Sequence, residues 1–274
     1  MTIEKQLLYL LSKVDTMDGK ELLKIYEAMN YTPQTIRNLL SKLKKEKYIV
    51  SVDRSVYSIS SSGRDVIHSF YRKKNYYMEK WNEKWYIVLM EIPETERKKR
   101  DTFRRNLIQL GFGHLYKSVY IHPWDISHII INMIDSLEIE SYVTMLASSE
   151  FILNKISSEG SSGTNKASEI WNLEKINTLY KEKLDWFEQE FEPAINQLLK
   201  DKNPDILKIF TGYLRLGETI NDLLLIDPML PPEFSPKSWM GTNILDKFNK
   251  FHQSLANLIP KDSFYHVFLE KNHN

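Results

Sequence analysis

Three stretches of helical periodicity and then two short β-rich runs occupy residues 1–59, and this order constrains the N-terminal fold strongly. Apolar residues recur at helical spacing over residues 3–11 and again over 21–29, which predicts two amphipathic helices. Thr32 and Pro33 mark a third start, because threonine caps a free amide and proline suits the first helical position. We expect the third helix to run from Pro33 to about Lys47.

The third predicted helix has an apolar stripe of Ile36, Leu39, Leu40 and Leu43. Its opposite face is polar and basic, as expected of a helix that enters the major groove of DNA. There arginine forks onto guanine, asparagine or glutamine pairs with adenine, and lysine reaches phosphates. The candidate DNA-binding residues on this helix are Thr32, Gln34, Thr35, Arg37, Asn38, Ser41, Lys42 and Lys45.

Two β-rich runs follow, over residues 48–52 and 56–59, around the polar turn 53–55. They predict a hairpin with Arg54 near its tip. Three helices and a hairpin indicate a winged helix-turn-helix domain over residues 1–62, with Arg54 on the wing as a further DNA-binding candidate. A winged helix that binds protein instead of DNA is the alternative for this module.

The middle of the chain mixes strand-like and helical segments. Residues 63–82, with several basic and aromatic side chains, predict a linker helix. From Trp85 a continuous apolar run predicts a buried strand, and the order that follows is β-α-β-α-β, with a middle strand long enough to bend into a hairpin. This order is typical of a ferredoxin-like domain, here over residues 83–156. A loop rich in serine and glycine follows over 157–168.

The last third is helical in pattern, with stretches over residues 171–199, 205–225 and 242–259 and a proline-rich turn over 227–241. The predicted fold is therefore a multidomain α+β protein. It has an N-terminal winged helix-turn-helix, a central ferredoxin-like (Cas-like) α+β domain, and a C-terminal α-helical domain over residues 169–274.

Charge and composition narrow the function. Residues 1–80 contain 15 basic and 9 acidic side chains, a net charge of +6, whereas the whole chain carries +1. A basic N-terminal segment joined to a mildly acidic remainder is typical of a protein that binds nucleic acid. Cysteine is absent, and no apolar run approaches the ~18 residues of a membrane span. We expect a cytoplasmic protein.

Enzyme signatures are missing from the sequence. It has no glycine-rich dinucleotide or phosphate loop and no Gly-x-Ser-x-Gly elbow. Its histidines lack the His-x-x-x-His spacing of a helical zinc site. We therefore expect no enzyme activity, no catalytic residue, no metal and no cofactor.

Several motifs, in order, resemble those of the PaaX family of bacterial transcription factors, repressors of phenylacetic acid degradation. They are Ile36-Arg37-Asn38-Leu39-Leu40-Ser41-Lys42-Leu43 in the third helix, the strand Trp85–Pro93, Arg104-Arg105, Leu110-Gly111-Phe112-Gly113, Ile121-His122-Pro123, and Asp227-Pro228-Met229-Leu230-Pro231 with Pro236-Lys237-Ser238-Trp239-Met240-Gly241. The matches span nearly the whole chain.

The resemblance implies a homodimeric repressor that binds a palindromic double-stranded operator and is released by an acyl-CoA effector such as phenylacetyl-CoA. The sequence departs from the family pattern at Glu218–Asp222, where relatives usually carry a histidine and arginine. The wing is also poor in arginine. The operator sequence and the effector of the family therefore need not be those of this protein.

Candidate effector-binding residues are Trp239, Asp227 and Arg215. Trp239 stands out because it lies in a proline-rigid turn, whereas Asp227 also suits a loop-capping role. A different class of function is a metal-dependent nuclease or nucleic-acid-processing protein. The middle segment also resembles the small nuclease-like subunit of CRISPR systems, with Glu91 near the end of the first strand as the candidate acid.

Overall fold

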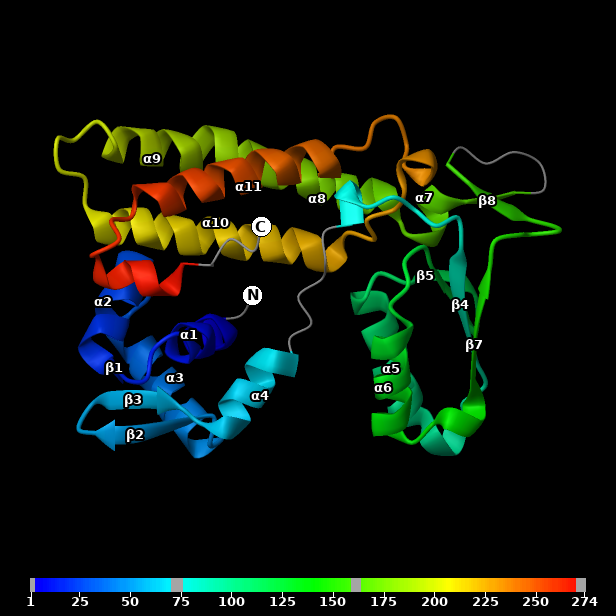
Figure 1. Cartoon of the computed structure of the whole chain (residues 1–274), viewed down its shortest axis with the longest axis horizontal. Helices are drawn as coiled ribbons and strands as arrows, with labels where there is room; N and C mark the ends of the chain where they lie inside the picture. Colours follow the sequence, from blue (N-terminus) through cyan, green and yellow to red (C-terminus); the bar gives the residue numbers. More distant parts are fainter. Residues whose placement is uncertain (1–2, 70–75, 159–163, 270–274) are drawn as a thin grey trace. The chain divides into compact units, whose positions relative to one another are not determined.

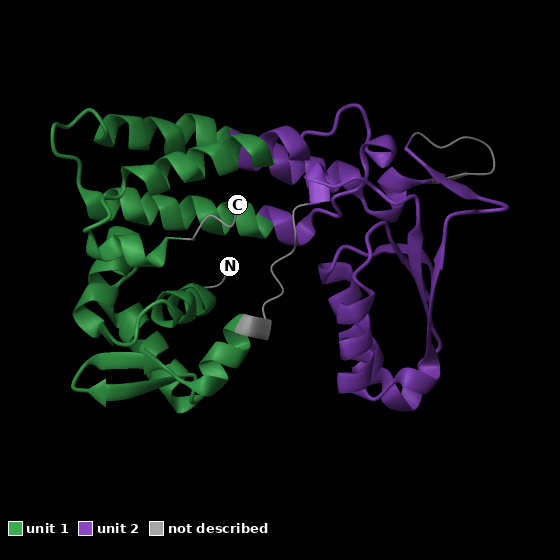
Figure 2. Ribbon diagram, viewed as in Figure 1, with its two compact units in different colours: residues 1–72, 185–222, 245–274 green, residues 73–184, 223–244 purple. Residues whose placement is uncertain are grey.

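The computed structural model describes residues 3–69, 76–158 and 164–269. Figure 1 shows the chain with its helices and most of its strands labelled. The chain divides into two compact units, coloured separately in Figure 2. Unit 1 comprises residues 1–72, 185–222 and 245–274, and unit 2 comprises residues 73–184 and 223–244. The C-terminal helical segment therefore contributes residues to both units.

The N-terminal part of unit 1 contains the three predicted helices and the predicted hairpin. The helices are α1 (Ile3–Ser12), α2 (Gly19–Ala28) and α3 (Pro33–Lys45), and the hairpin strands are β2 (Ile49–Asp53) and β3 (Val56–Ile59). A short strand that the sequence analysis missed, β1 (Met17–Asp18), pairs antiparallel with β3 and completes a three-stranded sheet of order β1-β3-β2. The core beneath it includes the fully buried Leu7, Leu22 and Ile36.

The helix predicted over residues 63–82 differs from the prediction at both ends. Helix α4 (Ser61–Ser69) begins two residues earlier, because the Ser60 hydroxyl accepts a hydrogen bond from the Gly63 amide at 3.0 Å and so caps the first turn. Residues 70–75 lie outside the described part of the chain. Beyond them, only a 3₁₀ turn (Tyr76–Met78) precedes strand β4, so residues 79–82 are not helical.

The C-terminal helical segment forms helices whose residues are divided between the two units. They are α8 (Leu173–Trp186), α9 (Glu192–Leu198), α10 (Ile206–Ile226) and α11 (Gly241–Leu258), followed by a 3₁₀ turn (Phe264–Phe268). A π-helical segment (Phe187–Phe191) joins α8 to α9. Pro193 accounts for it, because proline has no N–H for the regular hydrogen bond four residues back. The helix predicted over 171–199 therefore runs from residue 173 to residue 198 and changes its winding in the middle.

Unit 2 contains a four-stranded antiparallel sheet of order β5-β6-β4-β7. The strands are β4 (Trp85–Met90), β5 (Gly113–Tyr116), β6 (Val119–His122) and β7 (Val143–Ser148), with helices α5 (Arg97–Gln109) and α6 (Ser127–Leu137). A 3₁₀ turn (Glu94–Glu96) leads into α5, and another (Glu140–Tyr142) leads into β7. The chain runs β-α-β-β-α-β, so the predicted bend of the middle strand into a hairpin is confirmed and the domain is ferredoxin-like.

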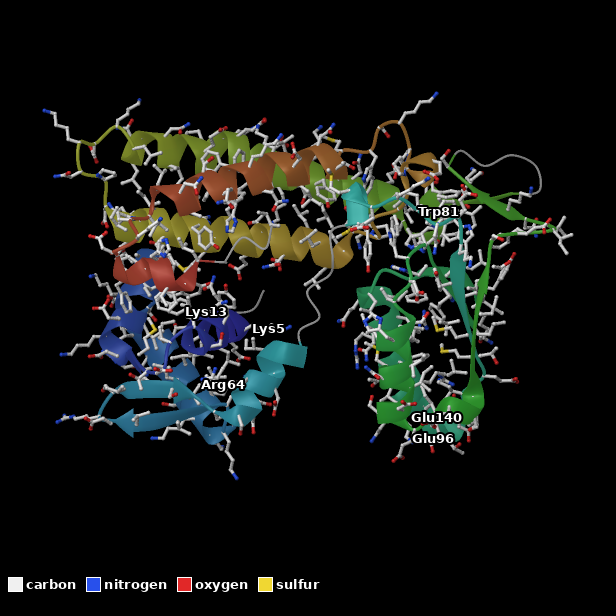
Figure 3. The ribbon with its side chains drawn as sticks, viewed as in Figure 1. Lys5, Lys13, Arg64, Trp81, Glu96 and Glu140 are labelled. Atoms are coloured by element: carbon white, nitrogen blue, oxygen red, sulfur yellow. The ribbon has the colours of Figure 1, made fainter. Side chains whose placement is uncertain are left out.

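One end of this sheet packs on an aromatic cluster within unit 2. Trp85 and Ile121 from the sheet meet Trp171 and Leu173 from the start of the C-terminal segment. The Trp81 indole, labelled in Figure 3, donates a hydrogen bond to the Pro123 carbonyl at 2.9 Å. The first glycine of the Gly-Phe-Gly turn, Gly111, has φ 96°. A glycine is required at this position because the left-handed conformation costs other residues about 1–2 kcal/mol.

The segment predicted as a loop over residues 157–168 contains regular structure at its ends. Strands β8 (Lys155–Ser157) and β9 (Thr164–Lys166) pair in parallel, and the short helix α7 (Ala167–Ile170) follows. Residues 159–163 lie outside the described part of the chain. The proline-rich turn contains one 3₁₀ turn (Pro232–Phe234). No helix in the described ranges is long and apolar enough to cross a membrane.

Candidate nucleic-acid interface

Helix α3 is fixed by its apolar stripe and by its N-terminal cap. The four stripe residues are buried, none more than 7% exposed. The Thr32 hydroxyl accepts a hydrogen bond from the Thr35 amide at 3.2 Å, and Pro33 occupies the first turn, as predicted. The buried stripe and the cap set both the rotation of the helix and its starting residue, so its polar face is turned to solvent.

The structure brings the candidate DNA-binding residues of α3 together on this face. All of them are exposed, namely Thr32, Gln34, Thr35, Arg37, Asn38, Ser41, Lys42 and Lys45. Gln34 and Asn38 are coupled, because Gln34 Nε2 donates to Asn38 Oδ1 at 2.7 Å. This bond uses one amide proton of Gln34 and the carbonyl oxygen of Asn38. It does not use the other Gln34 proton, the Gln34 oxygen or the two Asn38 protons, so the pair offers donors and acceptors in a fixed relative position.

Lys42 has a partner that the sequence analysis did not anticipate. Its Nζ forms an ion pair with Glu4 of α1 at 2.5 Å, and this hydrogen bond raises the pKa of Lys42. Both side chains remain partly exposed. Glu4 lies 38 positions earlier in the chain, so local sequence patterns contain no signal for the pair. A phosphate would therefore compete with the Glu4 carboxylate for the charge of the Lys42 ammonium.

Arg54 occupies the loop between β2 and β3. Asp53 and Val56 are paired across the strands, so Arg54 and Ser55 form a two-residue hairpin loop, with Ser55 at φ 60°. The Asp53 carboxylate accepts the Arg54 amide at 2.6 Å and holds this turn. The Arg54 side chain is exposed, with its guanidinium free to extend from the tip of the hairpin.

Two of the candidate effector residues belong to one buried network in unit 2. Asp227 is 0% exposed, and its Oδ2 accepts hydrogen bonds from the hydroxyls of Tyr77 and Tyr180, each at 2.6 Å. Asp227 Oδ1 accepts the Met229 amide at 2.7 Å. Trp239 joins the network because its Nε1 donates to the Tyr77 hydroxyl at 2.9 Å.

This environment changes the pKa of both tyrosine hydroxyls. Burial first, and then the charge of Asp227, raises the pKa of both Tyr77 and Tyr180, so both hydroxyls remain protonated donors. The sequence analysis did not single out either tyrosine, since they lie 150 and 47 positions from Asp227. Their contacts give Asp227 a structural role in tying the proline-rich turn to the rest of unit 2.

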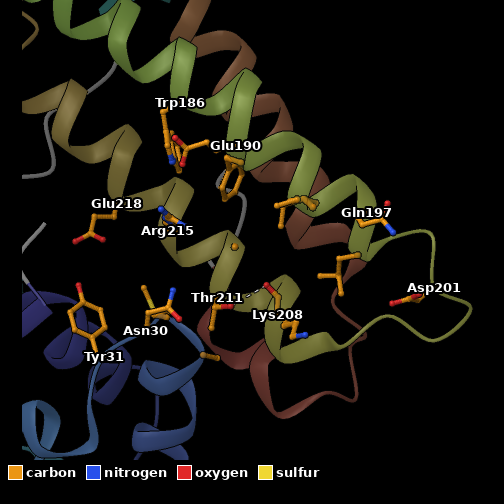
Figure 4. A pocket seen from close by; sticks show the side chains of 17 residues that line it. Asn30, Tyr31, Trp186, Glu190, Gln197, Asp201, Lys208, Thr211, Arg215 and Glu218 are labelled. Carbon is orange, nitrogen blue, oxygen red and sulfur yellow. Dashed lines mark hydrogen bonds between the residues drawn. The ribbon is translucent and has the colours of Figure 1, made fainter.

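Arg215, the third candidate effector residue, lies in unit 1 on helix α10. Its guanidinium carbon is 5.2 Å from the ring centroid of Trp186, within the range of a cation–π contact. Figure 4 shows Arg215 in a groove whose wall also includes Asn30 and Tyr31, from the turn before α3. Arg215 therefore belongs to unit 1, whereas Asp227 and Trp239 belong to unit 2.

The alternative nuclease site receives no support. Glu91 is exposed directly after β4, and its amide donates to the Tyr142 carbonyl at 2.9 Å, which continues the pairing of the strand. Among the described residues, no group of three or more histidine, aspartate or glutamate side chains is arranged to hold a metal ion. A single exposed carboxylate does not form a two-metal or hydrolytic site.

Comparison with known proteins identifies the family of the chain from its central and C-terminal parts. The model of the PaaX protein central Cas2-like domain matches residues 78–161, and the model of the PaaX-like protein C-terminal domain matches residues 171–261. The chain belongs to the PaaX family. Members of this family are transcriptional regulators rather than enzymes, which agrees with the sequence-based prediction of a regulator.

A comparison with solved structures finds a protein of similar fold to this PaaX-family chain. The uncharacterized protein Rv0674 from Mycobacterium tuberculosis superposes with a TM-score of 0.53 at 16% sequence identity, over 88% of each chain. At this identity the likeness shows the fold alone. No curated protein matches the sequence significantly.

Proposed function

We propose that this PaaX-family protein is a DNA-binding transcriptional repressor that acts as a homodimer on a palindromic operator. Residues 1–62 would form its winged helix-turn-helix domain, with α3 as the recognition helix and the β2–β3 hairpin as the wing. The observation that carries the proposal is the exposed polar and basic face of α3 opposite its buried stripe. Two copies related by a two-fold axis would each read one half-site.

The residues on α3 suggest separate roles in DNA binding. Arg37 offers a planar fork to the O6 and N7 atoms of guanine, and the coupled Gln34–Asn38 amides suit the N6 and N7 atoms of adenine. Lys42 and Lys45, one to two turns further along, suit phosphates, as does Arg54 on the wing. The helix would therefore specify sequence near its start and fix position near its end.

The effector is the second part of the proposal. Family resemblance implies an aryl-acyl effector, with phenylacetyl-CoA as the candidate. An effector that binds one arrangement of the dimer more tightly than the other shifts the population and lowers operator affinity.

The test is DNA binding by the full-length protein to its own upstream region, titrated with phenylacetyl-CoA and with free coenzyme A as control. Arg37→Ala should weaken specific binding by about 1–3 kcal/mol, the discrimination of one bidentate base contact. The matched control is Arg105→Ala, an exposed arginine on α5 of unit 2, which should leave binding unchanged. Specific binding that is insensitive to Arg37→Ala would refute the assignment of α3, and the absence of sequence-specific binding would refute the repressor.

A salt titration separates this proposal from the protein-binding alternative. A module that neutralises several phosphates loses affinity steeply with salt, with a slope of about 0.9 per phosphate contact. Lys45→Ala should lower that slope by about one contact while preserving sequence preference. An adaptor that binds protein through its winged helix would show no such salt-dependent DNA affinity.

A further inference from the structure

Helix α5 of unit 2 has a basic outer face. Six of its 13 residues are lysine or arginine, and one is aspartate. Three of the six bases form ion pairs with neighbouring carboxylates, namely Arg97, Lys99 and Arg100. The other three are exposed and form no ion pair within the described ranges, namely Lys98, Arg104 and Arg105. A patch of exposed positive charge without carboxylate partners attracts anions.

A buried hydroxyl lies within electrostatic reach of Arg104. Tyr120 on β6 is 0% exposed, and no residue of the described ranges supplies a hydrogen-bond partner for its hydroxyl. Burial raises the pKa of this hydroxyl, and the positive charge of Arg104 acts in the opposite direction. The ring of His114, exposed on the edge strand β5, stacks on the Tyr120 ring with the two centroids 5.1 Å apart. Three elements of unit 2 therefore bring a guanidinium, a hydroxyl donor and an imidazole together.

These groups have the chemistry of a phosphate site. A guanidinium fork binds a phosphate through two parallel hydrogen bonds, and a phosphate oxygen would supply the acceptor that the Tyr120 hydroxyl lacks. The Arg105 guanidinium uses one N–H on Thr102 Oγ1 at 3.3 Å, which leaves its other N–H groups available. Lys98 lies seven residues before Arg105, about 10 Å along the helix and on the same side. The patch can therefore bind separate phosphates of one ligand.

Other candidate ligand sites in the chain suit a polyphosphate less well. The groove beside Arg215 in unit 1 is lined by three acidic and two basic side chains, so its charge opposes a polyanion. The hydrogen-bond network in unit 2 that includes Trp239 is centred on the buried carboxylate of Asp227, which repels anions. The exposed bases of α3 belong to the proposed DNA contacts. The arginine pair on α5 has no part in those contacts and remains available to a small ligand.

We propose that the face of α5 around Arg104 and Arg105, together with Tyr120 and His114, binds the phosphate groups of a coenzyme A thioester. The identity of this ligand rests on the proposed function, in which an aryl-acyl-CoA is the effector. The inference assigns a site to the nucleotide portion of that effector. Binding of the phosphates does not depend on DNA, so it can be measured with the protein alone.

The experiment is isothermal titration of the full-length protein, without DNA, using phenylacetyl-CoA, free coenzyme A and phenylacetyl-pantetheine, which has the acyl group but no phosphate. Arg104→Gln should weaken the binding of both coenzyme A compounds by about tenfold or more, the loss of at least one charge-assisted hydrogen bond. It should leave the affinity for phenylacetyl-pantetheine unchanged. The matched control is Arg97→Gln, an exposed arginine of the same helix that is already paired with Glu94 and Asp101, and it should bind as the wild type does.

Two further measurements test the geometry of the site. Tyr120→Phe removes only the hydroxyl, and it should weaken the binding of free coenzyme A by about threefold, the loss of one hydrogen bond. Arg104 is exposed, so Arg104→Gln and Arg97→Gln should both keep the wild-type thermal unfolding temperature. Weaker binding by Arg104→Gln at an unchanged unfolding temperature then reports the lost contact and not a loss of folded protein.

Four results would overturn the inference: no binding of either coenzyme A compound by the wild type, unchanged binding by Arg104→Gln, equal weakening by Arg97→Gln, or wild-type affinity in Tyr120→Phe. Loss of operator binding in Arg104→Gln would also overturn it, because the face would then belong to DNA phosphates. Phosphate binding by a protein that lacks specific DNA binding would refute the proposed repressor and leave the phosphate site standing. Binding of coenzyme A without release of DNA by phenylacetyl-CoA would refute only the effector.

Discussion

Replacing Asp227 by asparagine should destabilise unit 2 strongly even though the two side chains have nearly the same shape. Three donors converge on the carboxylate of this buried residue, the hydroxyls of Tyr77 and Tyr180 on Oδ2 and the amide of Met229 on Oδ1. An asparagine offers one oxygen and one NH₂ group, so if its oxygen keeps the Met229 amide, its NH₂ faces the two tyrosine hydroxyls. The hydroxyls must then rotate to accept from the NH₂ group, so their protons lose the carboxylate and the charge-assisted hydrogen bonds are replaced by neutral ones.

The magnitude follows from the energies of such contacts. A hydrogen bond to a charged group contributes about 1.5–3 kcal/mol, and an unpaired buried donor costs about 1–3 kcal/mol. Removing a buried charge recovers part of this loss, since the charged carboxylate itself is costly to bury. We expect Asp227→Asn to lower the free energy of unfolding by about 2–4 kcal/mol, which corresponds to a fall of roughly 5–15 °C in unfolding temperature.

Scanning calorimetry of the full-length protein measures this effect, with Asp135→Asn as the matched control. Asp135 is an exposed aspartate on α6 of the same unit, and its replacement should stay within about 0.5 kcal/mol of wild type. A double-mutant cycle with Tyr180→Phe should show non-additivity, because the two changes remove the same bond. An Asp227→Asn protein as stable as the Asp135→Asn control would show that the buried carboxylate does not hold the turn.

Four further perturbations follow from named contacts. Burial raises the pKa of Tyr180 above that in the unfolded chain, so above about pH 10 the hydroxyl ionises in the unfolded state first. The free energy of unfolding should therefore be constant below about pH 10 and decrease above it, and urea titrations should show a smaller decrease in Tyr180→Phe. Gly113→Ala places a Cβ 2.4 Å from Ile170 Cγ2 and 2.5 Å from Trp171 Cε2, so calorimetry should show a loss of about 1–3 kcal/mol. Asn30 has φ 67°, so Asn30→Ala should destabilise unit 1 by about 1 kcal/mol, whereas Asn30→Gly should not, since only glycine takes the left-handed region freely. Glu4→Gln should release Lys42 and strengthen DNA binding at low salt, and an unchanged affinity would show that Lys42 does not reach a phosphate.

Features determined by neighbours in the chain were predictable from the sequence. The cap at Thr32 and Pro33 specifies the start of α3 because capping joins residues three positions apart. The β-α-β-β-α-β order of unit 2 was predictable from alternating periods and from an extended segment too long for one strand. The exposed face of α3 followed from its stripe, since helical geometry alone places residues three and four apart on one side.

Other features depend on residues that only the folded chain brings together. The pairing of β1 with β3, the Lys42–Glu4 ion pair, the tyrosines that donate to Asp227, and the groove beside Arg215 all join segments far apart in sequence. Such contacts require closure of long loops, and no local periodicity encodes which residues meet. The sequence by itself therefore determined most of the helices and strands, the family resemblance and the polar face of α3. Only the tertiary structure decided that Asp227 is a buried hydrogen-bond acceptor and that Arg215 borders the turn before α3.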